Sequence, residues 1–517
     1  MAELASQPTP AAGAASAEQP IPAGDYPVVV VGSGPGGLQA SYALRRLGIE
    51  HAVISADPAP GGMFRRFPFF QRLLSWTKPY APVPRSERWY EWYDWNSLLA
   101  DEPANRSIMP ELMDGSSSFP SRPEMERNLA EFAGRAGVRV RYDCRWQATR
   151  RDGDRFVLST SDGDYRCRAA IFAVGVAEPW KPATPGFEHI PHYADTRAAA
   201  EYAGRRLFLV GKENSAFELA TGLLPWAQRI VLASPRPAQL SVNSHSLAGI
   251  RARYIQPVED EILGGGVFIL NASIERMEQV AGGGFRAHCV RSDGGGEIKI
   301  EADDVIAATG WTCPLQDLEP LGVAVFGRSK LPSMTNFWQS STVPGIFFAG
   351  TIGQGSAGMK KYGLPANSGA VQGARYNARV MVEHLAASVF GVAPERPTIA
   401  PDRLVDYLLE QATRAPELWN QKSYLARAVS LDPSDGLRDG GIVPLADFVD
   451  TEGAAAVAIT VETDDTGSIH PAVYVRQANR PAVETLLEPH PLHDFRTGEN
   501  RARLAELLKE ATGGAVA

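Results

Sequence analysis

The clearest hydrophobic pattern in the chain is a short continuous apolar run that ends at a glycine-rich turn. Residues 28–31 read VVVV, residues 32–37 read GSGPGG, and residues 51–55 read HAVIS. Four apolar residues without alternation are typical of a buried parallel strand, and the apolar spacing over residues 38–47 is typical of a helix. The pattern therefore predicts a strand, a tight turn, a helix and a second parallel strand.

The glycine spacing of this turn indicates a dinucleotide-binding site. Gly32 permits the tight turn, Gly34 lets a pyrophosphate approach the backbone, and Gly37 lets the helix pack closely on the strand. The N-terminus of the helix then faces the anion. The acidic residue expected at the end of the second strand is replaced by Ser55, with Asp57 two places on. Either Asp57 substitutes for it, or the ribose is held more loosely.

The same pattern recurs in the middle of the chain. Residues 207–210 read LFLV, Gly211 opens a turn, a helix is predicted from about Asn214, and residues 229–234 read RIVLAS. Ala216 takes the third-glycine position, where a small residue still permits close packing. The repeat predicts a second dinucleotide-binding unit.

The turn of this second unit departs from the pattern, because Glu213 replaces its second glycine. A carboxylate there lies beside a diphosphate of like charge, a costly arrangement unless the side chain swings out or Lys212 neutralises it. The nucleotide binds in a displaced pose, binds weakly, or is no longer bound at all. Ser215 and Glu218 have the spacing of a capping box for the helix. Arg236 follows the second strand, where the 2′-phosphate of NADPH would lie.

Three further apolar strands end at turns of small residues. They are residues 170–182 (AIFAVGVAEPWKP), 304–314 (DVIAATGWTCP) and 345–358 (GIFFAGTIGQGSAG). One such turn is ordinary in an α/β protein, but three around two dinucleotide motifs indicate a flavoprotein. We predict that its nicotinamide-binding domain is inserted into its FAD-binding domain.

The predicted fold class is α/β, with two Rossmann-like dinucleotide-binding domains and a small C-terminal α+β appendage. The appendage is predicted to contain a helix at each end and two strands between them. The predicted segments are a disordered tail at 1–24, the first segment of the FAD-binding domain at 25–197, an inserted NAD(P)-binding domain at 198–310, the second segment of the FAD-binding domain at 311–398, and the appendage at 399–517. The predicted cofactor-binding residues are Gly32, Gly34, Gly36, Gly37, Ser55, Asp57, Gly61, Gly62, Gly175, Gly211, Asn214, Ser215, Arg236, Gly310, Gly350 and Thr351.

Composition and charge narrow the function classes. The chain has 51 basic and 59 acidic side chains and a net charge of −8, without a basic block, so we expect no nucleic-acid partner. No apolar run approaches the length of about 18 residues that a membrane helix needs, so we expect no membrane partner. Residues 1–24 lack the basic start and apolar stretch of a signal peptide, so a cytoplasmic location is predicted.

The cysteines and histidines give no support to thiol or metal chemistry. The four cysteines, Cys144, Cys167, Cys289 and Cys313, lie far apart and form no C-x-x-C pair, which disfavours a dithiol relay. The nine histidines form no H-x-x-x-H or H-E-x-x-H pattern. We therefore predict no metal site.

The order of these motifs resembles that of flavin-containing monooxygenases and N-hydroxylases. It is more similar to that of the FAD-dependent oxidoreductase domain-containing proteins, from about residue 25 to 390. The stretches that carry the resemblance are RRFPFFQRLLSWTKPY (65–80), YDWNSLL (93–99), GKENSAFELA (211–220), SHSLAGIRARY (244–254) and SGAVQGARYNAR (368–379).

The resemblance implies FAD, a reduced nicotinamide as electron donor, and a flavin that reacts with oxygen or another acceptor. Flavin monooxygenases place an asparagine near the flavin in a stretch similar to LLSWTKP, where Thr77 is the nearest candidate. Lys361 would also lie near the flavin. Asp94, in the aromatic-rich stretch 64–95, and Asn96, directly after it, either orient a substrate or the flavin, or cap a helix. Thr77, Asp94, Asn96 and Lys361 are our candidate catalytic residues.

The functional hypothesis is an FAD-dependent monooxygenase that uses NADPH or NADH. It would oxygenate an amine nitrogen or a sulfur of a small molecule through a flavin peroxide, with dioxygen as second substrate, in specialised metabolism. One alternative is an oxidase or dehydrogenase that its own substrate reduces, with a degenerate nicotinamide site. Another is a non-catalytic flavin-binding partner protein. A homodimer is one expected assembly.

Overall fold

A four-stranded parallel sheet, in the order β17-β6-β1-β2, lies at the centre of the first nucleotide-binding unit. The computed structural model describes residues 20–68, 72–241, 249–355, 367–431 and 436–512. Almost every residue of the four strands is buried, because both faces of the sheet are covered, and this explains why they show no alternation of apolar and polar residues. The strands are β1 (Val28–Val31), β2 (His51–Ile54), β6 (Ala169–Phe172) and β17 (Ile346–Phe348).

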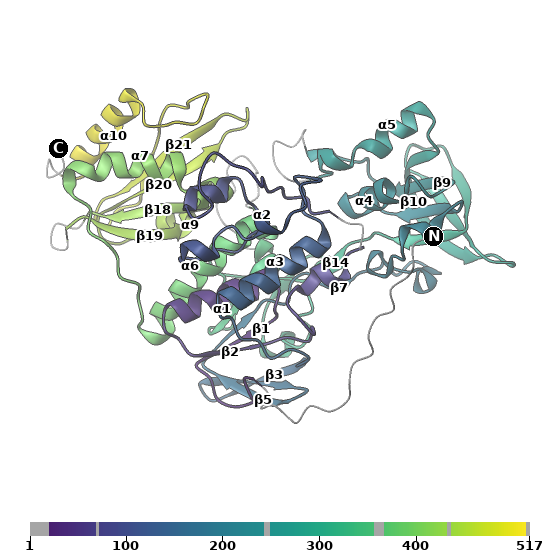
Figure 1. Ribbon diagram of the computed structural model, residues 1–517, viewed down its shortest axis with the longest axis horizontal. Helices are drawn as coiled ribbons and strands as arrows, with labels where there is room; N and C mark the ends of the chain where they lie inside the picture. Colours follow the sequence, from purple (N-terminus) through teal and green to yellow (C-terminus); the bar gives the residue numbers. More distant parts are fainter. Residues whose placement is uncertain (1–19, 69–71, 242–248, 356–366, 432–435, 513–517) are drawn as a thin grey trace.

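Helices and a small meander pack around this sheet (Figure 1). Helix α1 packs along helix α6, the long helix that follows the last turn of the unit. Helix α3 begins at Ser121, whose side chain accepts a hydrogen bond from the backbone N–H of Glu124 in a capping box. The elements are α1 (Pro35–Arg46), α3 (Arg122–Arg135), α6 (Val371–Phe390), β3 (Trp146–Asp152), β4 (Arg155–Thr160) and β5 (Gly163–Cys167).

A second unit is inserted between β6 and β17. Its six-stranded sheet has the order β12-β11-β10-β9-β8-β13. The strands β10, β9, β8 and β13 pair in parallel, and β11 and β12 add an antiparallel edge. The short strands β7 (Glu178–Pro179) and β14 (Trp311–Thr312) pair where the chain leaves and re-enters the first unit. The remaining elements are β8 (Arg206–Val210), α4 (Asn214–Leu223), β9 (Arg229–Ser234), α5 (Gln256–Leu263), β10 (Val267–Gln279), β11 (Phe285–Arg291), β12 (Glu297–Ala302) and β13 (Asp304–Ala307).

The C-terminal region forms a separate lobe, at the upper left of Figure 1, around an antiparallel sheet in the order β19-β18-β20-β21-β22. Helices α7 and α10 contact each other, and each also contacts a strand of this sheet. The elements are α7 (Leu404–Arg414), α8 (Pro416–Asn420), β18 (Leu425–Ser430), β19 (Arg438–Pro444), α9 (Leu445–Asp450), β20 (Ala456–Thr463), β21 (Ile469–Arg476), β22 (Val483–Leu486) and α10 (Gly498–Ala511).

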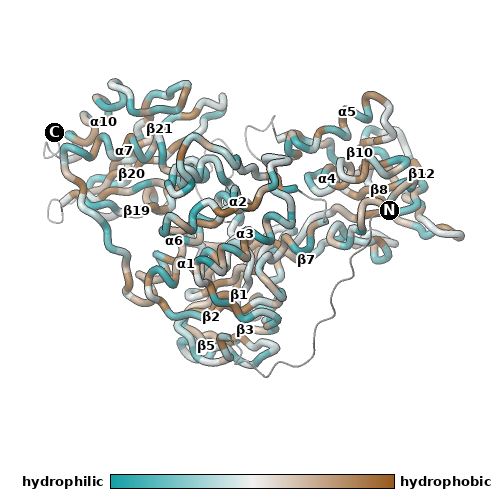
Figure 2. Tube along the Cα trace, viewed as in Figure 1, coloured by the Kyte–Doolittle hydropathy of each residue, from teal (hydrophilic) through white to brown (hydrophobic). Residues whose placement is uncertain are grey.

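These observations confirm the predicted fold class: two Rossmann-like units, one inserted in the other, and an α+β appendage. Apolar segments follow the sheets, as the brown stretches along β1 show in Figure 2. The core of the first unit joins residues from before and after the insertion, such as Tyr42, Phe172 and Trp338. Burying each such side chain contributes about 1.5–3 kcal/mol. In the described portion of the chain, no helix is long and apolar enough to cross a membrane.

Candidate functional site

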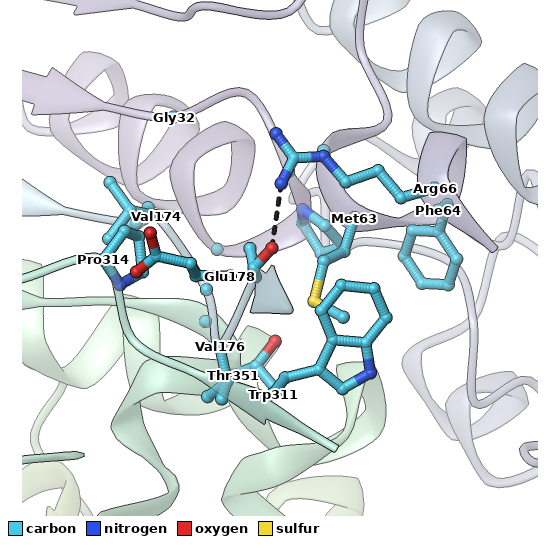
Figure 3. Close-up of a pocket in the computed structure, with 18 of the residues that line it drawn as sticks. Gly32, Met63, Phe64, Arg66, Val174, Val176, Glu178, Trp311, Pro314 and Thr351 are labelled. Atoms are coloured by element: carbon cyan, nitrogen blue, oxygen red, sulfur yellow. Dashed lines mark hydrogen bonds between the residues drawn. The ribbon is translucent and has the colours of Figure 1, made fainter. Parts of the chain in front are cut away.

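A cavity of about 960 Å³ lies where the two nucleotide-binding units meet. This volume is near the upper end of ordinary ligand pockets. The first unit lines it with the turn after β1, the end of β2 and the turns after β6 and β17, and the inserted unit lines it with the start of α4. Figure 3 shows Gly32, Met63, Arg66, Trp311 and Thr351 around this space. Turns from both units therefore face a shared cavity.

The turn after β1 fits an FAD pyrophosphate. Gly32 has a φ of 113°, in the region that favours glycine, and an added Cβ there would lie 2.5 Å from the carbonyl oxygen of Ala173. An added Cβ on Gly36 would collide with the backbone of Gly350. Helix α1 starts after Gly34, which has no side chain to cap its first N–H groups. Bare backbone and a helix N-terminus thus face the cavity, as anion binding requires.

The end of β2 supplies a polar pair to the same cavity. The Oγ atoms of Ser55 and Ser33 are 2.8 Å apart, and the backbone N–H of Asp57 donates to Ser55 Oγ at 3.2 Å. Ser55 and Asp57 both line the cavity. Asp57 thus lies on the cavity wall beside Ser55, and its contact with the ribose of FAD stays a prediction.

The second turn keeps its fold but not its predicted capping box. Gly211 has a φ of 129°, and an added Cβ there would lie 2.5 Å from the carbonyl oxygen of Ala308. Glu213 is the N-cap residue of α4, and among the described residues no side chain caps this helix. Glu218 instead accepts hydrogen bonds from the hydroxyls of Tyr193 and, at 2.9 Å, Tyr254. The capping-box prediction is therefore wrong, because Glu218 is held by two tyrosines.

The structure also shows which cation acts on Glu213. Lys212 is buried, and its Nζ donates to Oδ1 of Asn271; burial lowers the pKa of this lysine to about 8. Lys212 therefore does not neutralise Glu213. Arg328 lines the cavity with its guanidinium 4.6 Å from the ring centroid of Trp180. Partial burial raises the pKa of Glu213, and the charge of Arg328 acts against this rise.

Asn214 lines the cavity, but its side chain bonds the backbone of residues outside the cavity. Its Nδ2 donates to the carbonyl oxygen of Gly249 at 2.9 Å, and its Oδ1 accepts from the backbone N–H of Arg251 at 3.0 Å. What it offers a nucleotide is therefore the backbone N–H in the first turn of α4. Ser215 lines the cavity beside it, whereas Arg236 is exposed beyond the end of β9 and does not line the cavity.

Three of the candidate catalytic residues lie behind the cavity wall. Thr77, Asp94 and Asn96 are almost completely buried. Thr77 Oγ1 donates to Asp94 Oδ1 at 2.8 Å, and Asn96 Nδ2 donates to Thr77 Oγ1 at 2.9 Å. Ser75 donates to Asn96 Oδ1 and is the member of this group that lines the cavity. Thr77, Asp94 and Asn96 do not line the cavity, so the structure does not place them against a substrate or flavin there; they bond one another behind Ser75 and its bend.

Some of the other predicted residues line the cavity and others do not. Lys361 lies outside the described residues. The wall of the cavity includes several predicted small residues: Gly62, Gly175, Gly310, Gly350 and Thr351. Other predicted glycines pack behind it: Gly37, Gly61 and Gly211.

Sequence reasoning missed many wall residues, among them Trp311, Tyr193 and Arg328. Trp311 follows the predicted turn at Gly310, and Phe67 packs edge-on against it with ring centroids 6.4 Å apart. Tyr193 and Arg328 come from segments without a motif. The glycine before Trp311 was a signal for that residue, but no sequence pattern marks the other two.

The cysteines offer no thiolate to this site. All four are buried free thiols. Burial raises the pKa of Cys313, beside the cavity residue Pro314, to about 12. A thiol with such a pKa is protonated at neutral pH and is a poor nucleophile. Among the described residues, no group of three or more His, Cys, Asp or Glu side chains could hold a metal ion.

A family model described as pyridine nucleotide-disulphide oxidoreductase matches residues 29–350. The chain belongs to this family. The pyridine nucleotide-disulphide oxidoreductases and their relatives use FAD and NAD(P)H, so both cofactors are assigned to the chain. The matched residues include both nucleotide-binding turns and end before the C-terminal lobe.

Two curated relatives show what the chain is similar to. FAD-dependent oxidoreductase domain-containing protein 2 of Mus musculus is 26% identical over 444 residues, which are 78% of this chain and 64% of that protein. The chain thus spans less than two thirds of that relative. Ferredoxin--NADP reductase of Thermus thermophilus is 24% identical over 347 residues, 63% of this chain and 84% of that protein.

Solved structures show the same fold. A flavin-containing monooxygenase from Stenotrophomonas maltophilia has a TM-score of 0.52 at 20% identity, over 71% of this chain and 99% of that one. Bacillithiol disulfide reductase from Staphylococcus aureus has a TM-score of 0.55 at 15% identity, over 70% of this chain and 98% of that one.

Proposed function

We propose that the chain is an FAD-dependent, NAD(P)H-using monooxygenase that oxygenates the nitrogen or sulfur of a small molecule. The observation that supports this is the cavity that both nucleotide-binding units line. Gly32, Gly34 and the start of α1 would hold FAD, and the start of α4 would hold the nicotinamide dinucleotide. A direct hydride transfer needs such a shared space, because the two reacting rings have to come into contact.

Bound FAD would accept a hydride from NAD(P)H and deliver the electrons to dioxygen. The residues of the chain position the reactants and exclude water. Met63, Phe64, Phe67 and Trp311 form an apolar section of the cavity wall, and Arg66 fixes the wall by donating to the carbonyl oxygen of Ala177 at 2.8 Å. An apolar wall protects a reactive flavin from solvent, which a monooxygenase requires.

Two observations favour oxygen over a thiol relay as electron acceptor. All four cysteines are buried, burial raises the pKa of each of them, and they form no C-x-x-C pair, which supports an acceptor other than a dithiol. Flavin-containing monooxygenase and ornithine N-hydroxylase structures share the fold over 71% and 70% of this chain. The activities that give these proteins their names support, by likeness of fold, a small nucleophile as substrate.

A second candidate function is a flavoprotein that its own substrate reduces. Glu213 favours it, because a carboxylate at the N-cap of α4 would repel the pyrophosphate of a nicotinamide nucleotide bound at that helix. The two candidates differ in which compound bleaches the flavin.

Labelled dioxygen tests the proposed function. The purified holoprotein is incubated with NADPH, ¹⁸O₂ and a panel of amines and thioethers, and the products are analysed by mass spectrometry. One ¹⁸O atom per product molecule with matching NADPH consumption supports a monooxygenase. NADPH consumption that yields hydrogen peroxide with every compound, or product without NADPH, contradicts it.

A further inference from the structure

The C-terminal lobe reaches the wall of the flavin cavity through one buried side chain. Helix α8 ends at Asn420, and the next residue, Gln421, is completely buried. It lies against the 3₁₀ turn η12 (Asn367–Gly369) and the first turns of helix α6. Gln421 belongs to the C-terminal lobe, whereas η12 and α6 belong to the FAD-binding unit.

The hydrogen bonds of Gln421 use every polar group of its side chain. Its Oε1 accepts from the backbone N–H of Asn367 at 2.8 Å. Its Nε2 donates to Oδ1 of Asn377 at 2.6 Å and to Oγ of Ser368 at 3.1 Å. A buried amide whose three groups are all paired is costly to disturb, because each partner left unpaired loses about 1–3 kcal/mol.

The neighbouring residues close this network. Asn377 Nδ2 donates to Ser368 Oγ at 2.8 Å, and Asn367 Nδ2 donates to the carbonyl oxygen of Asn420 at 2.8 Å. Gly373 stands in the first turn of α6, and an added Cβ there would lie 3.1 Å from Cδ of Gln421 and would collide with the carbonyl of Asn367. Glycine weakens a helix, so its presence here indicates that the backbone of η12 needs to approach α6 closely, with Gln421 packed beside both.

The segment that Gln421 bonds, η12 and the start of α6, also adjoins the wall of the flavin cavity. Gly369, Ala370, Val371 and Ala374 line the cavity directly after the residues that Gln421 holds. The N-terminus of α6 therefore meets the cavity on one side and Gln421 on the other. A shift of this turn would change the backbone N–H groups that the helix presents to the cofactor.

A second contact anchors the same helix of the lobe. Glu417, on α8, forms an ion pair of 2.8 Å with Arg88, which also pairs with Glu91 at 3.1 Å. Glu91 accepts a hydrogen bond from the hydroxyl of Tyr376, on α6. The lobe is thus fixed to the FAD-binding unit independently of Gln421, so loss of Gln421 would alter the cavity wall without releasing the lobe.

From this geometry we propose that Gln421 is a positioning residue for the flavin. The C-terminal lobe holds η12 and the start of α6 in the conformation that binds FAD, although Gln421 does not line the cavity. The proposal rests on FAD binding, which the family assigns, and not on the monooxygenase reaction.

The test compares Gln421→Ala with Gln411→Ala. Gln411 lies in the same lobe, on α7, and bonds Arg427 at 3.1 Å, away from η12 and α6. Each holoprotein is assayed for the FAD dissociation constant, the visible circular dichroism of the bound flavin and the flavin reduction potential. We expect Gln421→Ala to raise the dissociation constant about tenfold, which corresponds to about 1.4 kcal/mol, and to change the spectrum and the potential. Gln411→Ala should match the parent protein.

Three outcomes would overturn the proposal. The first is a Gln421→Ala protein with parental FAD affinity, spectrum and potential, whatever its melting temperature. The second is an equal loss in both variants, which would indicate general destabilisation of the lobe. If Gln421→Ala does not fold, Gln421→Glu decides, because it keeps the acceptor for Asn367 and loses the donor to Asn377. The third overturning outcome is a Gln421→Glu protein with the parental flavin spectrum and reduction potential. A failed oxygenation assay leaves these flavin measurements unchanged, so the two proposals can fail separately.

Discussion

Replacement of Glu213 by glycine should tighten binding of the nicotinamide nucleotide. Glu213 has a φ of −108° and a ψ of −172°, an extended conformation that any residue adopts, so glycine introduces no strain. Glycine is also an acceptable N-cap, at a cost of a few tenths of a kcal/mol relative to the better N-cap residues. The substitution therefore removes charge and bulk from the nucleotide-binding turn and leaves α4 intact.

The expected gain follows from the charge and its surroundings. Glu213 is only partly buried, so solvent screens part of its repulsion, and Arg328 offsets some of the rest. Two unit charges about 6 Å apart in an effective dielectric of about 40 repel by about 1.4 kcal/mol. We therefore expect the dissociation constant of NADP⁺ to fall about tenfold in Glu213→Gly.

Isothermal titration of the holoprotein with NADP⁺ measures this change. Glu213→Gln separates the two causes, because it removes the charge and keeps the bulk. Burial raises the pKa of Glu213, so protonation as the pH falls toward that pKa should tighten NADP⁺ binding in the parent more than in Glu213→Gln. Equal dissociation constants in the parent and both variants would refute the reasoning, since Glu213 would then not face the nucleotide.

Three further predictions address the cavity. Gly36→Ala should lower FAD content about tenfold or more, because its Cβ would overlap the backbone of Gly350; a fully yellow protein, judged by its absorbance ratio, would contradict this. Arg328→Ala should weaken NADP⁺ binding about tenfold by titration, whereas Lys330→Ala on the same turn, which removes a lysine paired with Glu319, should not; equal effects would contradict a specific role. Cys313→Ala should leave the rate of flavin reduction by NADPH unchanged in stopped-flow measurements, because burial raises the pKa of this thiol to about 12; lost reduction would indicate a thiol relay.

The sequence predicts those features whose signal is local. Four consecutive valines and the spacing of Gly32, Gly34 and Gly37 predict a buried strand and a nucleotide turn, because few other folds need glycine at all three places. The insertion is also predictable, because the strands at 170–172 and 346–348 each end at a small-residue turn. Both features follow from short segments of the chain.

Features that depend on distant contacts were not predictable. Ser215 and Glu218 have the spacing of a capping box, but two tyrosines from other elements bind Glu218 instead. Thr77 and Asn96 stand in a stretch of aromatic residues, and only the fold shows that they bond each other behind the cavity.

The C-terminal lobe shows the same limit. Its strands β18 and β19 carry weak patterns, and β19 contains two adjacent glycines, Gly440 and Gly441, so two of its five strands were predicted from sequence. The homodimer and the cytoplasmic location stay predictions.

Anaerobic reduction tests the central claim that FAD and NAD(P)H meet in one cavity. The yellow holoprotein is mixed without oxygen with NADPH, and separately with NADH, while the flavin absorbance is followed. Rapid bleaching that saturates with the nucleotide concentration is the predicted result. No bleaching at millimolar concentrations of either nucleotide would contradict the claim.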